Sequence, residues 1–173
     1  MDTVESIDMM GILLDWLGDS AAALPYYEQA LKINKKLHGD ESYHAVEIMN
    51  KIGVLLAKLN DNKAAIPYFE ESLRIRKKFL GDEHRSVAQS LNNLGAMYEA
   101  QAKYATARGY YEQALKIRRK VLGDEHADTA TSISNMASLI DAEGDIAAAI
   151  PYYEHVGFSG GSGWFLTPLQ RMR

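Results

Sequence analysis

The residues best suited to chemistry are a histidine and two carboxylates that recur together along the chain. The phrase Gly-Asp-Glu-His occupies 81–84 and returns at 123–126, and a variant that ends in serine occupies 39–42. A histidine beside carboxylates can act as a general base or bind a metal ion. His84 and His126, however, are repeat-equivalent, so stacked helix pairs would hold them about 16–20 Å apart, which is two helix widths. They cannot share one ion, and we predict that each serves the loop in which it lies.

No other pattern in the sequence indicates catalysis. The chain has no cysteine, which removes thiolate nucleophiles, disulfides and zinc–thiolate sites. It carries no phosphate-binding loop and no nucleophile motif, and His38, His44 and His155 have no recurring partner. We interpret the recurring Asp-Glu pairs as turn formers that place negative charge before a helix N-terminus. The sequence therefore predicts a protein that is not an enzyme and has no metal and no cofactor.

Composition and charge limit the kind of partner. Hydrophobic residues make up 47% of the 173 residues and charged residues 24%, an ordinary balance for a globular protein. The net charge of −4, with no strongly basic half, argues against nucleic acid. No apolar run approaches the ~18 residues of a membrane span, and the acidic start of the chain does not look like a secretory signal. We expect a cytoplasmic protein with a protein or peptide partner, and neither nucleic acid nor a membrane.

The recurring phrase sets a period of 42 residues along the chain. A repeat of this length indicates one supersecondary unit stacked on copies of itself. We therefore divide the chain into a repeat domain over 1–156 and a tail over 157–173. The rows of the repeat domain are 1–38, 39–80, 81–122 and an incomplete 123–156.

Each row contains two helical patterns. In the third row the first pattern places Leu91, Leu94 and Tyr98 on one helical face. The spacing Ser86-x-x-Gln89 predicts a capping box at the start of this helix, and the glycine that opens the next row predicts the end of the second helix. Short turns between the two patterns predict antiparallel helix pairs.

Small residues on the first helix and aromatic residues on the second recur in register. Such small-against-large positions predict close, interdigitated packing of the two helices of each row. The small residues are Gly11, Gly53, Gly95 and Ala137, and the aromatic residues are Tyr27, Phe69, Tyr111 and Tyr153.

The pattern Leu-x-x-Leu-Gly-x-x-Tyr over 91–98, followed by Ala-x-x-x-Tyr over 107–111, resembles the tetratricopeptide repeat. The 42-residue spacing is similar to the long-helix form found in kinesin light chains. The resemblance implies an all-α, right-handed superhelical solenoid of antiparallel helix pairs, with about four repeats, the last incomplete. It also implies a non-catalytic protein–protein interaction module, an adaptor or scaffold that binds an extended peptide in a concave groove. The open alternatives are a kinesin-light-chain-like cargo adaptor and a regulatory or sensor domain of a larger signalling protein.

The resemblance further implies that the first helices line this groove, with repeat-equivalent positions forming ladders along it. The predicted peptide-binding residues are Glu47, Asn50, Val54, Gln89, Asn92, Asn93, Ala96, Glu99, Ser134, Asn135 and Ser138. An asparagine offers both a donor and an acceptor, so a row of them can bind the backbone of an extended peptide. The alternative is that these asparagines tolerate a half-exposed face or bond a neighbouring helix. The acidic ladder residues, which would favour a peptide with some basic character, are Glu5, Asp8, Asp15, Glu47, Glu99 and Asp141.

Basic residues gather at the end of the second helix in three rows. They are Lys32, Lys35, Lys36, Arg74, Arg76, Lys77, Lys78, Lys116, Arg118, Arg119 and Lys120. One interpretation is structural, because cations stabilise a helix C-terminus and i,i+4 pairs such as Glu70 with Arg74 add support. The other is a basic stripe that attracts an acidic peptide or a phosphate-bearing surface. The sequence leaves both interpretations open.

The period fails after Val156. The segment 157–173 begins with a Gly/Ser stretch typical of a flexible linker and continues with an apolar cluster around Trp164. Three interpretations stay open for this tail: a disordered end, a cap over the last apolar face, and a tethered ligand for the groove. Self-association through the incomplete last repeat or the tail is a further hypothesis.

Overall fold

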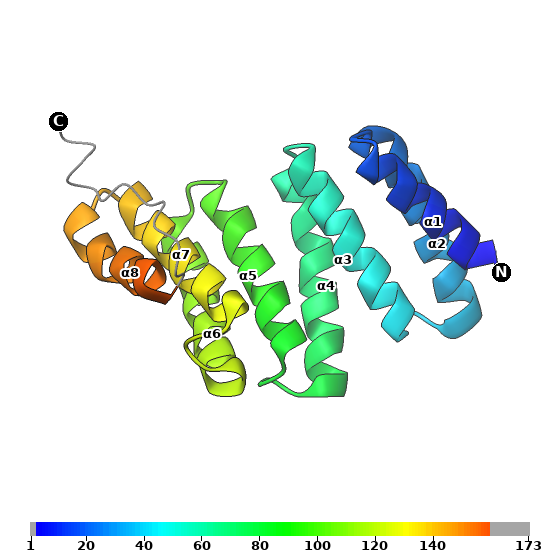
Figure 1. The fold of residues 1–173 in the computed structure, drawn as a ribbon. Coiled ribbons are helices and arrows are strands. Elements are labelled where there is room, and N and C mark those ends of the chain that lie inside the picture. Colours follow the sequence, from blue (N-terminus) through cyan, green and yellow to red (C-terminus); the bar gives the residue numbers. More distant parts are fainter. Residues whose placement is uncertain (1–2, 160–173) are drawn as a thin grey trace. The chain divides into compact units, whose positions relative to one another are not determined.

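The computed structural model describes the backbone of residues 3–159 and side chains over 4–156. All regular secondary structure in this range is α-helical, and the helices follow one another through short connections (Figure 1). They are α1 (Thr3–Trp16), α2 (Ser20–His38), α3 (Tyr43–Lys58), α4 (Asn62–Leu80), α5 (Arg85–Glu99), α6 (Tyr104–Leu122), α7 (Ala127–Ala142) and α8 (Ile146–Ser159). Each row thus holds the expected helix pair. The last helix continues to Ser159, and the remainder of the predicted tail lies outside the described residues.

The helices form two compact units, Met1–Asp82 and Glu83–Arg173. In the first unit α2 packs against both α1 and α3, and α3 packs against α4. In the second unit α6 packs against both α5 and α7, α7 packs against α8, and α5 also contacts α7. Within each unit, the second helix of one row therefore contacts the first helices of that row and of the next. The single repeat domain over 1–156 stays a prediction.

The turn inside each row is set by one residue with a left-handed backbone. Gly18 and Gly144 adopt φ of 85° and 89°, and the equivalent Asn60 and Ala102 adopt 62° and 56°. Such a residue ends the first helix and reverses the chain. The residue after it caps the second helix in three of the rows; Asp19, for example, accepts the backbone N–H three residues later at 3.0 Å. The helices of a row therefore run antiparallel because of a few local residues.

The joints between rows begin with a glycine whose φ lies between 79° and 86°, and they end with a helix cap. His84 Nδ1 accepts the Ser86 N–H at 3.1 Å, and His126 Nδ1 accepts the Asp128 N–H at 3.0 Å. Ser42 caps α3 at the equivalent position. The loop role predicted for the two histidines is confirmed. The predicted capping box at Ser86 is wrong, because the N-cap is His84, whose ring nitrogen accepts the Ser86 N–H, and the helix begins two residues sooner than a Ser86 cap would place it.

In the first three rows the small residue and the aromatic ring meet as the sequence predicts. A Cβ atom added to Gly95 would lie 2.6 Å from the ring of Tyr111, and one added to Gly53 would lie 2.7 Å from the ring of Phe69. The same contact at Gly11 measures 2.9 Å. These distances are too short for a real side chain, so the glycines allow the two helices of a row to approach closely.

Candidate functional site

All the predicted peptide-binding residues lie on first helices and are half-buried or exposed. The residues in the first unit are Glu47, Asn50 and Val54 on α3. The residues in the second unit, which we name the α5/α7 face, are Gln89, Asn92, Asn93, Ala96, Glu99, Ser134, Asn135 and Ser138. On another side of α5, Leu91 and Leu94 are only 2% and 0% exposed. The predicted residues therefore form polar surfaces above a packed apolar layer.

An amide bridge links the two helices of the α5/α7 face. Asn135 Nδ2 donates to Asn92 Oδ1 at 2.8 Å. This is the bond to a neighbouring helix that the sequence leaves open as the alternative to peptide binding. The bridge uses the oxygen of Asn92 and the nitrogen of Asn135, so each amide keeps its other polar group for a further hydrogen bond. The two side chains are held in a defined orientation at the surface.

The equivalent bridge in the first unit is ionic. Lys51 Nζ lies 2.7 Å from Asp8 Oδ2, and these residues occupy the positions of the amide bridge two rows earlier. About two helical turns further along, Lys58 Nζ lies 2.8 Å from Asp15 Oδ2. The hydrogen bond from Lys58 is the main cause of the lowered pKa of Asp15. Here α1 and α3 are joined by charge.

Two further acidic ladder residues differ in their partners. Glu47 Oε1 accepts from Arg76 at 2.9 Å, whereas Glu99 Oε2 accepts from the hydroxyl of Tyr111 at 2.7 Å. Burial raises the pKa of Tyr111, and the bond to Glu99 raises it further. The acidic ladder residues were expected to favour a basic peptide. Three of them already have a cationic partner within the chain: Asp8, Asp15 and Glu47.

The glutamate of the second-row joint binds the end of α4. Glu41 pairs with Lys78 and with Arg74, and these cations lower the pKa of its carboxyl, Lys78 more strongly. Arg74 also pairs with Glu71 at 2.8 Å. The predicted pairing of Arg74 with Glu70 is wrong, because the guanidinium lies between Glu71 and the joint instead.

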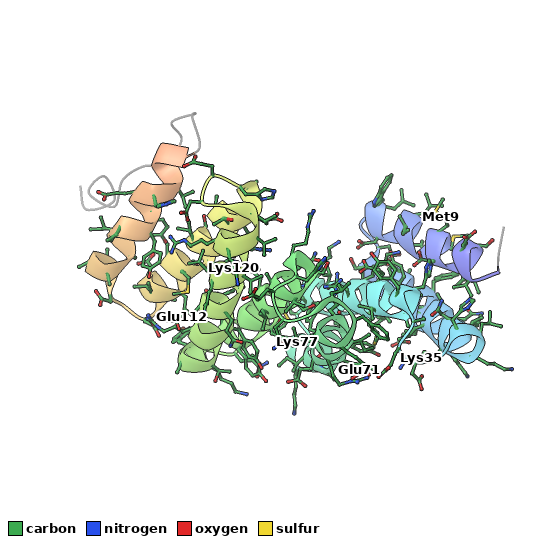
Figure 2. All side chains as sticks on the ribbon, turned by 90° about the horizontal axis from the view of Figure 1, so that it is seen from below. Met9, Lys35, Glu71, Lys77, Glu112 and Lys120 are labelled. Atoms are coloured by element: carbon green, nitrogen blue, oxygen red, sulfur yellow. The ribbon has the colours of Figure 1, made fainter. Side chains whose placement is uncertain are left out.

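The other joints pair with basic residues in the same way. In the second unit Lys120 pairs with Glu83. Lys35, Lys77 and Arg119 each pair with the joint aspartate five residues later, at 3.7, 3.4 and 2.8 Å (Figure 2 labels Lys35, Lys77 and Lys120). Since these cations already have partners in the chain, the structure favours the structural interpretation of the basic residues.

A buried polar position on the second helices was not identified from the sequence. Arg76 and Arg118 are 4% and 7% exposed, and the equivalent Asn34 is 2% exposed. Each follows the buried aromatic residue of its helix by seven residues, so the apolar periodicity was the available signal for its burial. Arg118 NH1 donates to the carbonyl of Asp128 at 2.8 Å and to Ser132 Oγ at 2.7 Å, and burial lowers its pKa. Arg118 thereby joins α6 to α7.

Other features of the described residues add little to the site. A cleft of about 360 Å³ in the first unit is lined by residues of α1, α2 and α3, including His38 and His44. In the part of the chain that the structure describes, no three histidines or carboxylates are grouped so that they could hold a metal ion. Nor does any described helix combine the length and apolar character that crossing a bilayer requires. The first-helix faces remain the candidate site.

Repeated helix pairs with small-against-aromatic packing define an all-α repeat solenoid. The model of the tetratricopeptide repeat matches three overlapping segments, 3–78, 46–120 and 86–156. The chain belongs to the tetratricopeptide repeat family. This fold is generally a non-catalytic scaffold, and the chain is a protein-interaction module. A comparison with curated protein sequences finds no match.

Solved structures share the fold. BtubC (BKLC) from P. vanneervenii is 23% identical with a TM-score of 0.82, over 94% of this chain and 66% of that chain. A Podosopora anserina structure described as a kinesin light chain with nearly identical TPR-like repeats is 21% identical with a TM-score of 0.78, over 96% of this chain and 80% of that one. The apo form of RapI is 18% identical with a TM-score of 0.76, over 90% of this chain and 42% of that one. This chain therefore corresponds to part of each of these proteins.

Proposed function

We propose that this chain is an adaptor or scaffold domain that binds an extended peptide segment of a partner protein on its first-helix faces. The α5/α7 face is the main contact surface. The observation that carries the proposal is the bridge between Asn92 and Asn135, which fixes two amide groups on neighbouring helices at a polar surface. An extended peptide presents alternating N–H and C=O groups, and oriented amides can bond both kinds whatever the peptide side chains are.

The surroundings of the bridge suit a peptide backbone. Ala96, Ser134 and Ser138 are small, so they let a backbone approach the helices. The helices beneath are fixed by packing, since Ile133 and Leu139 on α7 are both 0% exposed. A surface held on rigid elements loses little conformational freedom when a ligand binds. These features support recognition of an extended segment.

A random peptide library displayed on phage tests the proposal. Wild-type protein should select peptides that bind the Asn92→Ala/Asn135→Ala variant about 5–10-fold more weakly, because two hydrogen-bonding amides are lost. Glu112→Ala is the matched control, since Glu112 is exposed on the second helix α6 and is labelled in Figure 2. Helicity from circular dichroism should be the same for all three proteins.

Two results would contradict the proposal. One is selection of no peptide by the wild-type protein. The other is equal binding of every selected peptide by the double variant and the wild type. Loss of binding in the Glu112→Ala control would place the contact on the second helices instead.

A regulatory or sensor domain of a larger protein is the alternative to the adaptor proposal. A kinesin-light-chain-like cargo adaptor is the narrower form of the proposal. Small-angle scattering with a selected peptide tests the alternative, because a clear change in the radius of gyration on binding would favour a sensor. The absence of cysteine suits the reducing cytoplasm, and a fluorescent fusion would test that location.

A further inference from the structure

We infer that this chain binds a second copy of itself end to end, with α1 of one copy seated on α8 of the other. The second copy takes the place of a further row, in the register that joins α2 to α3 in the first unit and α6 to α7 in the second. The inference does not depend on peptide binding by the first-helix faces. It rests on exposed apolar residues of α1 and α8 whose repeat equivalents are buried.

Two apolar residues of α1 are exposed at positions that are buried on α7. Met10 and Leu13 are 45% and 52% exposed. Their equivalents on α7, Met136 and Leu139, are 2% and 0% exposed. On α7 these two residues belong to an apolar cluster that includes Tyr111 of the preceding helix α6. The face of α1 that carries Met10 and Leu13 therefore matches a surface that packs against a second helix.

The apolar side of α8 is more exposed than the equivalent side of α6. Tyr111 on α6 is 2% exposed, whereas its equivalent Tyr153 on α8 is only half-buried. Ile150, one turn earlier on α8, is 37% exposed. Among the described helices α6 packs against both α5 and α7, whereas α8 packs chiefly against α7. Apolar side chains of α8 are thus open where α6 receives the next first helix.

The register between rows brings apolar residues together at the end of the first helix. In the second unit Arg108 of α6 pairs with Glu143, the C-cap of α7. One row further along, the same two positions hold Ile150 and, on the next copy, Leu17. Leu17 is 81% exposed in the single chain. An ion pair between rows is therefore replaced at the junction by two apolar side chains that bury each other.

The first helices of the two copies are also complementary. In the first unit Asp15 of α1 pairs with Lys58 of α3. The same two positions at the junction hold Asp141 and, on the next copy, Trp16. Trp16 is 83% exposed, and its indole N–H can donate to the carboxylate of Asp141. One arrangement thus gives a partner to each of the highly exposed residues at the end of α1.

The junction joins two different faces, so it is heterologous. Each added copy leaves one α1 face and one α8 face open, and further copies can bind in the same way. The first-helix faces of successive copies then follow one another in series. A junction of one helix pair on another is small, so we expect a Kd on the order of 100 µM.

Sedimentation velocity over a range of concentrations tests the inference on the full chain. The mean mass of the wild type should rise with concentration. Leu13→Glu on α1 and Ile150→Glu on α8 should each weaken association about tenfold or more, because the junction would bury an unpaired charge. Val121→Glu is the matched control, since Val121 is exposed on α6 and the change in charge is the same. Circular dichroism should show the same helicity for all four proteins.

A mixture of two variants tests whether the junction is head to tail. Leu13→Glu keeps its α8 face, and Ile150→Glu keeps its α1 face. Each variant alone should be monomeric, whereas their mixture should form a pair that stops at two copies. A symmetric interface, in which both copies use the same face, would give no such recovery.

An exchange of charges tests the register. The double variant Leu17→Glu/Ile150→Arg recreates between copies the pair of Arg108 with Glu143. Each single substitution should weaken association, and the double variant should restore it. The restored association should weaken in high sodium chloride, since salt screens an exposed ion pair. No recovery in the double variant would overturn the register.

Three outcomes would overturn self-association through these faces: a monomeric wild type, association that survives Leu13→Glu, or a mixture that stays monomeric. The variant Trp164→Glu/Phe165→Glu identifies the occupant if the wild type is monomeric. Association of this variant alone would mean that the segment 160–173 covers α8 in place of a second copy. Monomers in both cases would leave the faces to another partner. The phage selection is a separate measurement, so failure of the proposed function would not alter these masses.

Discussion

The two units have the same helix pairs but join their first helices through different chemistry. In the first unit α1 and α3 are linked by the ion pairs of Asp8 with Lys51 and of Asp15 with Lys58. In the second unit α5 and α7 are linked by the amide bridge. The register is identical, since the bridging positions are two rows apart.

This difference between the two units shows that the residues that pack the helices and the residues that face a ligand are separate sets. Between the helices of a row, the rows use the same solution, a glycine against an aromatic ring in three of them. On the first-helix faces, equivalent positions carry unlike residues, as Glu47 and Gln89 do. The ion pairs satisfy their own charges, whereas amides keep capacity for a ligand. Residues that face a neighbouring helix axis therefore set the fold, and residues on the outer face set what each unit can bind.

The largest effect on stability should come from replacing the glycines that face the aromatic rings. We expect Gly95→Ala to lower the free energy of unfolding by about 1–3 kcal/mol, because its Cβ would lie 2.6 Å from the Tyr111 ring. Gly53→Ala should act similarly in the first unit. Urea unfolding followed by hydrogen exchange measures this free energy. Amides of the two units are analysed separately, which shows whether the loss of stability is confined to the substituted unit.

Gly109→Ala is the matched control for these substitutions. It lies within α6, and a Cβ there would meet nothing within 4 Å. It should raise stability by about 0.5–1 kcal/mol through helix propensity. If Gly95→Ala is as harmless as Gly109→Ala, the close contact does not determine the packing of the row.

A smaller effect should distinguish the two kinds of bridge. Double-mutant cycles to alanine should give a coupling of about 0.5–1 kcal/mol for Asp8 with Lys51 and about 0.5–1.5 kcal/mol for Asn92 with Asn135. The ionic coupling should fall in high sodium chloride, since salt screens a half-exposed pair, and the amide coupling should not. Equal salt dependence of both couplings would remove the electrostatic difference between the units.

The smallest effect should appear on acidification. Cationic partners lower the pKa of Asp15, Glu41 and Glu71 in the first unit, below ordinary values of 3.8 for aspartate and 4.5 for glutamate. A lowered pKa adds stability above the ordinary value, and that stability is lost as the pH falls through the lowered one. Hydrogen exchange, corrected for intrinsic rates, should therefore show the first unit opening more as the pH drops below about 4. Asp15→Asn should reduce this dependence, and an unchanged pH profile in that variant would contradict the assignment.

Much of the fold was predictable because the 42-residue period carries packing information directly. Gly95 and Tyr111 recur as a small–large pair, and volume complementarity needs no knowledge of the rest of the molecule. The joint histidines were also predictable as loop residues. Their capping function was not, because the choice between His84 and Ser86 as the cap depends on which lone pair reaches the first N–H groups.

The candidate site was less accessible from sequence. The positions of the face residues followed from the register, but their partners did not. Asp8 and Lys51 are 43 residues apart, so their contact depends on how neighbouring first helices are offset. Arg118 was grouped with the exposed bases, although it lies two turns after Tyr111 on the buried side. Charge at the end of a helix suggested exposure, whereas the seven-residue spacing from Tyr111 indicated the buried side, and the packing of α6 against α7 agrees with that spacing.

The joint glutamates of the second and third rows pair within their own rows. Glu41, near the start of the second row, binds Lys78 near its end, and Glu83 binds Lys120 in the third row in the same way. A gene segment cut from joint to joint therefore carries both members of this pair. Duplication or deletion of such a 42-residue cassette keeps each of these two glutamates together with its ammonium. A cut from joint to joint is therefore the division of the array that keeps this glutamate–lysine pair inside one unit.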